Sequence, residues 1–325
     1  NPGVAGSNPA GRTIWIKILL KGGEMSRSKK IIIIEHPYSD YDFYNCVFVP
    51  SKVPKLLEAE GTCFAIENLI NMNPELKNKK LDIVEFMSGK GEFEKHIRDE
   101  AKFEIGKYMG IDAVPQDTPR TELIVGDVLS VFPNFKADIV LALYYSASSV
   151  SGADGQPSPT AMRAMSINAF NNLNEGGGFF LSFASQGEAL SFDLSDGEDD
   201  EENEVAIPIY NGLRKKFDLP ETEKASLSFE QDNIYDRKNG LMIETMKNIR
   251  VKDKDDNTVG IIEMKQPLKQ LYMSESHIVD NLKQVGFKDL VFFDISFDEG
   301  HVTIEKLDDI MIESEQFATH ILAIK

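Results

Sequence analysis

The residues of this chain that are best suited to chemistry follow the apolar run Leu81–Val84. Glu85 ends that run, and a short loop with Gly89 and Gly91 leads into a polar stretch that suits a helix. Glycines let a loop backbone come close to a ligand, and the N-terminus of the next helix offers unpaired N–H groups. A buried strand, a glycine loop and a helix in this order predict a unit that binds a nucleotide.

Two common nucleotide motifs do not fit this loop. A dinucleotide-binding fingerprint needs a third glycine for close packing of helix on strand, and Glu94 occupies that position. A phosphate-binding P-loop needs Ser or Thr after its Gly-Lys pair, whereas Gly89-Lys90 is followed by Gly91. Its upstream glycine is also missing, because Val84 stands there. The sequence therefore argues against NAD, FAD and a P-loop nucleotide.

The segment Glu85-Phe86-Met87-Ser88-Gly89-Lys90-Gly91 resembles the acid-x-G-x-G-x-G loop of class I S-adenosylmethionine-dependent methyltransferases, in particular those acting on small molecules. The chain departs from this pattern at Met87, where the family usually has its first glycine. Taken alone, the loop also matches an ordinary strand-to-helix turn, so the segments that follow decide between the two interpretations.

Three apolar strands follow the loop in the order that the family has. The first ends at Asp112, about 20 residues beyond the glycines, where an acid in such folds binds a ribose hydroxyl. The second is Thr121–Val128, and the third is Ala137–Tyr145, which resembles the family's central strand. A helix is predicted after Ser158, and a glycine turn leads from it into the strand Phe179–Phe183. The resemblance spans residues 81–185.

The resemblance implies that S-adenosylmethionine is the cofactor and S-adenosylhomocysteine the product. Gly89 and Gly91 would let the loop, with Met87 in it, pass close to the methionine part of the donor. Glu85 would fix that loop, and Asp112 would bind the ribose hydroxyls.

Further along the chain, Asp127 with Val128 would hold the adenine edge, and Leu143 and Tyr144 would line the pocket for the methyl donor. Tyr145 with the adjoining Ser146 would point toward the acceptor. No convincing general base is found.

The resemblance predicts an enzyme that transfers a methyl group to a nitrogen or oxygen atom of a small molecule by in-line displacement. A protein or RNA methyltransferase, and a catalytically inactive protein that binds S-adenosylmethionine, remain alternatives. The residues after the central strand, Leu143-Tyr144-Tyr145-Ser146, differ from the Asn/Asp-Pro-Pro-Tyr motif of enzymes that methylate bases or glutamine.

Composition narrows the partners. The chain has 325 residues, 42% of them apolar, and a formal net charge of −18. Such a charge disfavours a nucleic-acid partner, because that binding depends on Lys and Arg neutralising phosphates. Two cysteines, Cys46 and Cys63, predict reduced thiols in a cytoplasmic protein. The five histidines are scattered without a close ligand pair, so no metal is expected, and no apolar run of transmembrane length is present.

The expected fold class is α/β: a seven-stranded mixed, mostly parallel sheet with helices on both faces, plus a small β-rich insertion. The first predicted part is a leader at 1–24, which is either foreign to the natural protein or removed from it and is expected to be disordered. A cap or lid at 25–80 and the nucleotide-binding core at 81–185 follow. An insertion at 186–273 is expected to cover the substrate and to contain an acidic, solvated loop at 193–204, and residues 274–325 complete the core sheet.

Overall fold

The computed structural model describes residues 12–16, 29–36, 40–47, 53–113, 122–143, 146–152, 155–184, 203–209, 211–298, 301–307 and 320–325. The chain divides into two compact units, one formed by residues 1–52, 197–234 and 243–268 and the other by residues 53–196, 235–242 and 269–325. Both the segment 25–80 and the segment 186–273 are therefore shared between the units. The long helix that begins at Val53 belongs to the unit that contains the glycine loop.

The core sheet has eight strands in the order β14-β13-β15-β7-β6-β3-β4-β5. The strands from β5 through β7 in this order are parallel, whereas β15 is antiparallel to both β7 and β13, and β14 is antiparallel to β13. The predicted α/β class is thereby confirmed, with one edge strand, β14, more than expected. The bounds are β3 (Leu81–Phe86), β4 (Ile105–Asp112), β5 (Glu122–Val125), β6 (Ala137–Ala142), β7 (Leu173–Ser182), β13 (Asp289–Asp298), β14 (His301–Leu307) and β15 (His320–Ile324).

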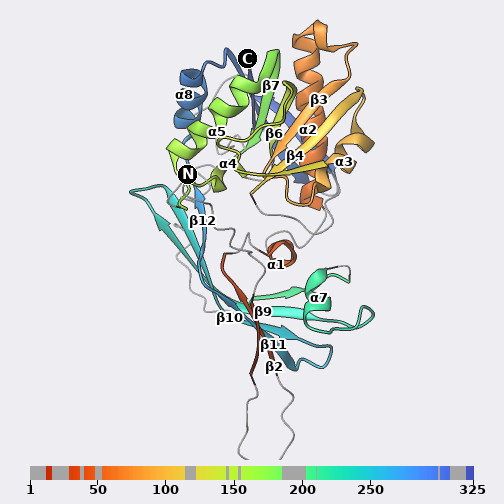
Figure 1. The fold of residues 1–325 in the computed structure, drawn as a ribbon, viewed down its shortest axis with the longest axis vertical. Helices are drawn as coiled ribbons and strands as arrows, with labels where there is room; N and C mark the ends of the chain where they lie inside the picture. The colour runs from red at the N-terminus through yellow and green to blue at the C-terminus, as the bar shows by residue number, and fades with distance from the viewer. Residues whose placement is uncertain are drawn as a thin grey trace, which may run out of the picture. The chain divides into compact units, whose positions relative to one another are not determined.

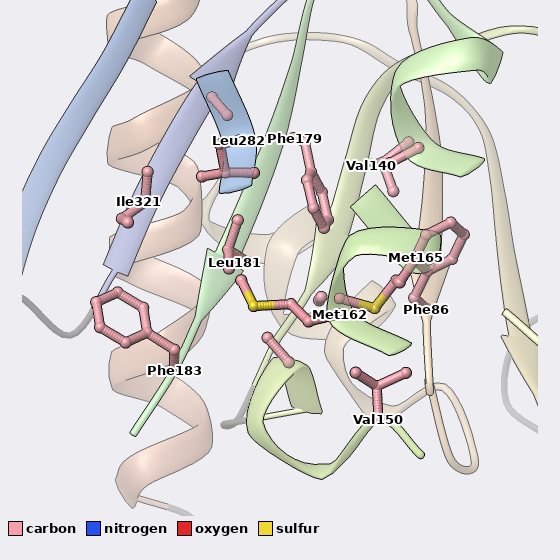
Figure 2. Close-up of a cluster of buried hydrophobic side chains, with 14 of the residues drawn as sticks. Phe86, Val140, Val150, Met162, Met165, Phe179, Leu181, Phe183, Leu282 and Ile321 are labelled. Carbon is pink, nitrogen blue, oxygen red and sulfur yellow. The ribbon is translucent and has the colours of Figure 1, made fainter. Parts of the chain in front are cut away.

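Helices cover both faces of this sheet because its strands are apolar on both sides (Figure 1). Successive residues alternate between the faces: Ile139 packs toward α2 (Val53–Met72) and α3 (Glu92–Glu100), and Val140 toward α5 (Pro159–Asn172) and α8 (Glu275–Val285). Figure 2 shows Met162 and Met165 of α5 among the strand side chains on the second face. The short elements of this unit are η2 (Pro74–Leu76) and α4 (Ser146–Ser149).

The two helices on that second face begin at the predicted serine caps, and α8 also ends where the sequence predicts. The Ser158 side chain accepts a hydrogen bond from the main chain of Ala161, and the Ser274 side chain caps α8. Gly286 ends α8 at a φ of 121°. The predicted turn at 174–178 is different: β7 begins at Leu173, directly after α5. This strand accommodates a left-handed residue, Gly176, with a φ of 71°.

A second sheet has seven strands, six of them in the order β1-β2-β11-β10-β9-β8, with β12 paired to β10. The apolar run at 31–34 by itself predicts only an edge strand, but β2 (Lys29–Ile34) lies between β1 and β11 and runs parallel to β11. The apolar core on this second sheet also includes residues of α1 (Tyr41–Val47) and α7 (Gly212–Lys216). The strands are β1 (Arg12–Ile16), β2 (Lys29–Ile34), β8 (Asn203–Ala206), β9 (Ser226–Asp236), β10 (Leu241–Lys252), β11 (Thr258–Met264) and β12 (Leu268–Leu271).

The predicted hairpin turn at 253–257 joins β10 to β11, with the Asp253 N–H donating to the Asn257 carbonyl at 3.0 Å. The acidic loop at 193–204 lies outside the described residues up to 202, and its last two residues begin β8.

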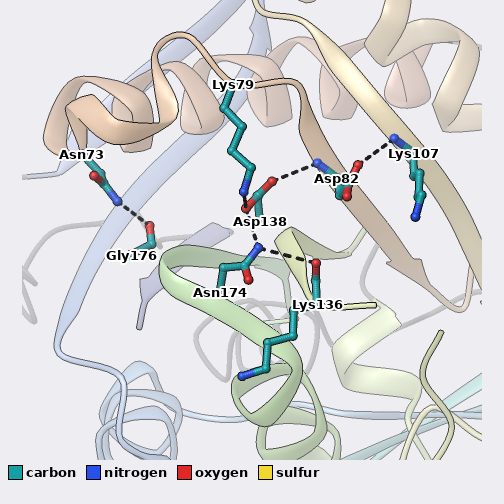
Figure 3. A network of polar contacts seen from close by, with 8 residues as sticks. All are labelled: Asn73, Lys79, Asp82, Lys107, Lys136, Asp138, Asn174 and Gly176. Carbon is teal, nitrogen blue, oxygen red and sulfur yellow. Dashed lines mark hydrogen bonds and ion pairs between the residues drawn. The ribbon is translucent and has the colours of Figure 1, made fainter. Parts of the chain in front are cut away.

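At the amino ends of the core strands, buried polar groups are paired with one another (Figure 3). Asp138, at the start of β6, is fully buried and accepts hydrogen bonds from Lys79 Nζ at 2.6 Å and Asn174 Nδ2 at 2.7 Å. Its second oxygen accepts from the Asp82 N–H at 3.0 Å, and the Asp82 carboxylate accepts from the Lys107 N–H at 2.9 Å. This network joins β3, β4, β6 and β7.

The two cysteines are free and buried, and desolvation raises the pKa of each thiol to about 12. Both are therefore protonated, unreactive thiols at neutral pH. Among the helices of the described residues, none is both long enough and apolar enough to cross a lipid bilayer.

Candidate functional site

The glycine loop runs from the end of β3 to the start of α3 through three left-handed residues. Met87 has a φ of 52°, Gly89 of 55° and Gly91 of 71°. Main-chain hydrogen bonds hold the loop: the Ser88 N–H donates to the Ile111 carbonyl at 3.3 Å, and the Gly91 N–H donates to the Ser88 carbonyl at 2.9 Å. Met87 thus adopts a conformation that glycine normally supplies, so this departure from the methyltransferase pattern leaves the turn intact.

Asp112 joins the second strand of the site to this loop. It is the last residue of β4, and its Oδ2 accepts a hydrogen bond from the Gly89 N–H at 2.8 Å. The structure therefore brings together the loop and the acid that the sequence predicts to act on one ligand, although they are 23 residues apart.

Glu85 lies beneath the loop and is only 2% exposed. The Tyr108 hydroxyl donates to Glu85 Oε2 at 2.8 Å, and burial together with the neighbouring carboxylate raises the pKa of Tyr108 well above its usual range. Tyr108 is therefore a protonated donor that fixes Glu85. The sequence alone assigned no role to this tyrosine. The one feature that could have pointed to it is its hydroxyl group, which stands among apolar residues of a strand expected to be buried.

Ser88 is a second residue of the site that sequence reasoning missed. It lies between Met87 and Gly89, is 6% exposed, and its Oγ has no hydrogen-bond partner among the described residues. A buried hydroxyl without a partner loses the hydrogen bonds that it makes in water, so such groups are rare in folded proteins. Its position within the loop points to a polar ligand group there.

Asp127 and Val128 follow β5 and differ in their surroundings. Asp127 is exposed, and its Oδ1 accepts from the Leu129 N–H at 2.9 Å, which shapes the turn. Val128 is 5% exposed and packs into the apolar core, while its carbonyl accepts from Asn168 Nδ2 at 2.9 Å. Of the pair, Asp127 is the one whose side chain faces solvent at the strand end.

Leu143 follows β6 and is buried, with its carbonyl accepting from the Ser146 N–H at 3.1 Å and from the Ser146 hydroxyl. The predicted residues Tyr144 and Tyr145 lie outside the described residues. Helix α4 begins at Ser146, and Ser148 Oγ accepts from the Ala184 N–H at 2.8 Å, which ties α4 to the residues that follow β7.

The strands β5, β4, β3 and β6 are neighbours and run parallel. Asp112 is the last residue of β4, and the glycine loop follows β3. Asp127 follows β5, and Leu143 follows β6. Ligands of open α/β sheets bind outside the carboxyl ends of parallel strands, where connecting loops diverge. The glycine loop and Asp112 are in contact at such an edge, and Asp127 and Leu143 lie at the neighbouring strand ends. Within the described residues, no group of three His, Cys, Asp or Glu side chains could hold a metal ion.

Comparison with models of known protein families finds no match, and comparison with curated proteins finds none either. Among solved structures, the chain is similar to a sugar N-methyltransferase from a Streptoalloteichus species, with a TM-score of 0.53 and 11% identity over 87% of this chain and 92% of that one. It is also similar to an S-adenosylmethionine-dependent methyltransferase from Clostridium acetobutylicum, with a TM-score of 0.51 and 13% identity over 86% of this chain and 94% of that one. The chain therefore has the fold of class I methyltransferases.

Proposed function

We propose that this chain is an S-adenosylmethionine-dependent methyltransferase that transfers a methyl group to a nitrogen or oxygen atom of a small molecule. One observation carries the proposal: the Asp112 carboxylate is hydrogen-bonded at 2.8 Å to the Gly89 N–H of the glycine loop. An acid that can bind ribose hydroxyls and a loop that can approach the methionine part of the donor are thereby adjacent, on a class I methyltransferase fold.

The residues present fit this donor. The left-handed loop brings main chain rather than side chains to the ligand, and the Ser88 hydroxyl, which has no partner among the described residues, offers a hydrogen bond to a polar group of the donor. Glu85, fixed by Tyr108, supports the loop from below. Asp127 lies at the next strand end for the adenine, and Leu143 provides an apolar wall.

When bound, S-adenosylmethionine supplies an activated methyl group whose leaving group is a neutral thioether. The protein then has mainly to hold an acceptor atom in line with that methyl group, because correct orientation alone removes a large part of the barrier. Glu85 and Asp112 fix the loop and hence the position of the donor. A proton-accepting residue is needed only for acceptors that must lose a proton before they react.

A small acceptor is favoured over a nucleic acid by the net charge of −18, which repels polyanions. The similar Streptoalloteichus protein is named as a sugar N-methyltransferase, in keeping with a compact acceptor here.

Calorimetric titration of S-adenosylmethionine and S-adenosylhomocysteine into the wild type and Asp112→Ala tests the proposal. We expect saturable binding of both ligands by the wild type and at least about tenfold weaker binding by the variant, because the ribose partner and the loop anchor are both removed. Asp99→Ala removes an exposed carboxylate of α3 that pairs with Lys95, and should bind like the wild type. Absence of binding by a folded wild-type protein would overturn the proposal.

A further inference from the structure

A small cluster of buried side chains lies apart from the large apolar cores. It consists of Ala184, Met242 and Tyr272, with Tyr235 packed against them, and is called here the tyrosine cluster. The two tyrosine rings meet edge to face, with centroids 6.3 Å apart and an interplanar angle of 68°. Its members come from the end of β7, from the β9–β10 hairpin and from the segment after β12, all within the unit that contains the glycine loop.

The cluster lies at the carboxyl edge of the core sheet. Ala184 follows β7, and its carbonyl accepts from the Met273 N–H at 3.4 Å, next to Tyr272. The Ala184 N–H donates to Ser148 of α4, and the first residue of α4, Ser146, donates its N–H to the carbonyl of the candidate residue Leu143 after β6. The neighbouring strand ends of β6 and β7 are therefore connected to the cluster by hydrogen bonds.

The Tyr235 hydroxyl is the unusual feature of the cluster. Its oxygen is buried, and within the described part of the chain it has no hydrogen-bond partner. The hydroxyl of a buried tyrosine usually has a hydrogen-bond partner, because an unpaired hydroxyl loses its hydrogen bonds to water and thereby destabilises the fold. Phenylalanine would fill the same space at no such cost. The hydroxyl therefore indicates a hydrogen bond made to a group that the described residues do not supply.

We propose that the tyrosine cluster binds the methyl acceptor and that this acceptor is a neutral amine on a compact, largely apolar body. The inference rests on the proposed function. The Met242 thioether and the aromatic rings suit an apolar body, and the Tyr235 oxygen accepts a hydrogen bond from the amine N–H. The amine lone pair is then held away from the phenol and is available to the methyl group.

The transfer balances without a base in the cluster. The nitrogen lone pair forms the new N–C bond, the C–S bond breaks with its electron pair on sulfur, and the nitrogen becomes a cationic ammonium. Aromatic faces attract a cation, so the rings of Tyr235 and Tyr272 favour the charge as it develops. The ammonium product releases its extra proton to water afterwards. The four members of the cluster include no carboxylate and no imidazole, which an alcohol acceptor would require.

A stability comparison tests the unpartnered hydroxyl without any acceptor. Tyr235→Phe should keep the wild-type melting temperature or raise it. Tyr108→Phe is the matched control, because it removes a buried hydroxyl that is hydrogen-bonded to Glu85, and it should melt at a temperature lower by about 2 °C or more. Equal losses in both variants would show that the Tyr235 hydroxyl has a structural partner and would overturn the inference.

Methyl transfer to cyclohexylamine and cyclohexanol, measured by mass spectrometry with isotope-labelled S-adenosylmethionine from about pH 7 to 10, tests the acceptor class, because an alkylamine loses its proton only toward the upper end of that range. We expect the amine to be methylated and the alcohol not, and Tyr235→Phe to lower kcat/KM for the amine about tenfold while leaving donor affinity unchanged. If the wild type binds the donor but does not methylate the amine, or if Tyr235→Phe leaves kcat/KM unchanged, the inference fails alone. If the wild type does not bind the donor, the proposed function fails as well.

Discussion

The two edges of the core sheet differ in the pairing of one buried polar group each. At the amino edge, the fully buried Asp138 is paired with Lys79, Asn174 and the main chain of Asp82 (Figure 3). At the carboxyl edge, a buried hydroxyl of the glycine loop, that of Ser88, has no partner among the described residues. The residue before it, Met87, occupies a backbone region that disfavours side chains.

This difference separates stability from function. Polar groups whose partners are all within the fold stabilise it, and removing one leaves the others unpaired. Groups without partners, and strained backbone, weaken the fold and persist where a ligand or a reaction uses them. The contrast supports the proposal that the amino edge holds the strands together and that the carboxyl edge binds the ligand.

The largest effect on stability is expected from Asp138→Ala, which removes the centre of the amino-edge network. The free energy of unfolding should fall by about 3 kcal/mol in urea titrations, because three hydrogen-bond donors lose the fully buried acceptor that they share. Glu104→Ala is the control at the same edge, since Glu104 forms an exposed ion pair with Lys80 and should change stability by less than about 0.5 kcal/mol. Equal effects would remove the distinction between buried network and surface pair.

The second sheet also contains a polar group that burial destabilises, the carboxylate of Glu244 in β10. This carboxylate is half-buried, accepts from Gln231 Nε2 at 3.2 Å, and burial raises its pKa from 4.5 to about 7. The folded state therefore retains a proton that the unfolded chain releases, so the free energy of unfolding should fall as the pH rises from about 4.5 to 7.

The variant Glu244→Gln removes this titration. It should match the wild type near pH 4 and exceed its free energy of unfolding by about 2 kcal/mol at pH 8, measured by urea unfolding across the pH range. Glu230→Gln changes an exposed carboxylate on β9 and should leave the pH dependence of the wild type intact. A parallel stability curve for Glu244→Gln and the wild type would contradict the burial argument.

Replacement of Met87 measures the strain of the glycine loop. Met87→Gly relieves the left-handed conformation but also removes a side chain that packs against the core, whereas Met87→Ala removes the packing alone. We expect the glycine variant to be more stable than the alanine variant by about 1 kcal/mol in thermal or urea unfolding. Equal stability of the two would mean that the loop carries no backbone strain at this position.

The smallest effect on stability is expected from Ser88→Ala at the carboxyl edge. The variant should unfold within about 0.5 kcal/mol of the wild type, since the lost hydroxyl has no partner among the described residues. Its affinity for S-adenosylmethionine should fall about tenfold, measured by calorimetry. A stability loss as large as that of Asp138→Ala, with full donor affinity, would reverse the assignment of the two edges.

Local patterns in the sequence were sufficient for most of the core. The apolar run at β3, the Ser158 and Ser274 caps, and the helical spacing of Met162 and Met165 each depend on neighbours within one element. The fold class and the succession of acids and glycines at strand ends could therefore be predicted.

Features that depend on distant residues could not be predicted in this way. The pairing of β2 with β11 joins segments more than 200 residues apart, so its register leaves no local signal. The contact of Tyr108 with Glu85 and the missing partner of Ser88 are likewise properties of the assembled sheet. In β7, Gly176 has the left-handed conformation of a turn residue, yet β7 pairs with β6 on both sides of it and therefore continues as one strand.

The position of β15 has a consequence for biosynthesis. A ribosome produces β7 and β13 before it produces β15, the strand that joins them. Until β15 is inserted, one side of each strand presents unpaired N–H and C=O groups, which readily pair with other chains. During translation, the nascent chain must therefore keep these two strand edges apart from other nascent chains, and chaperone demand should be greatest in that interval.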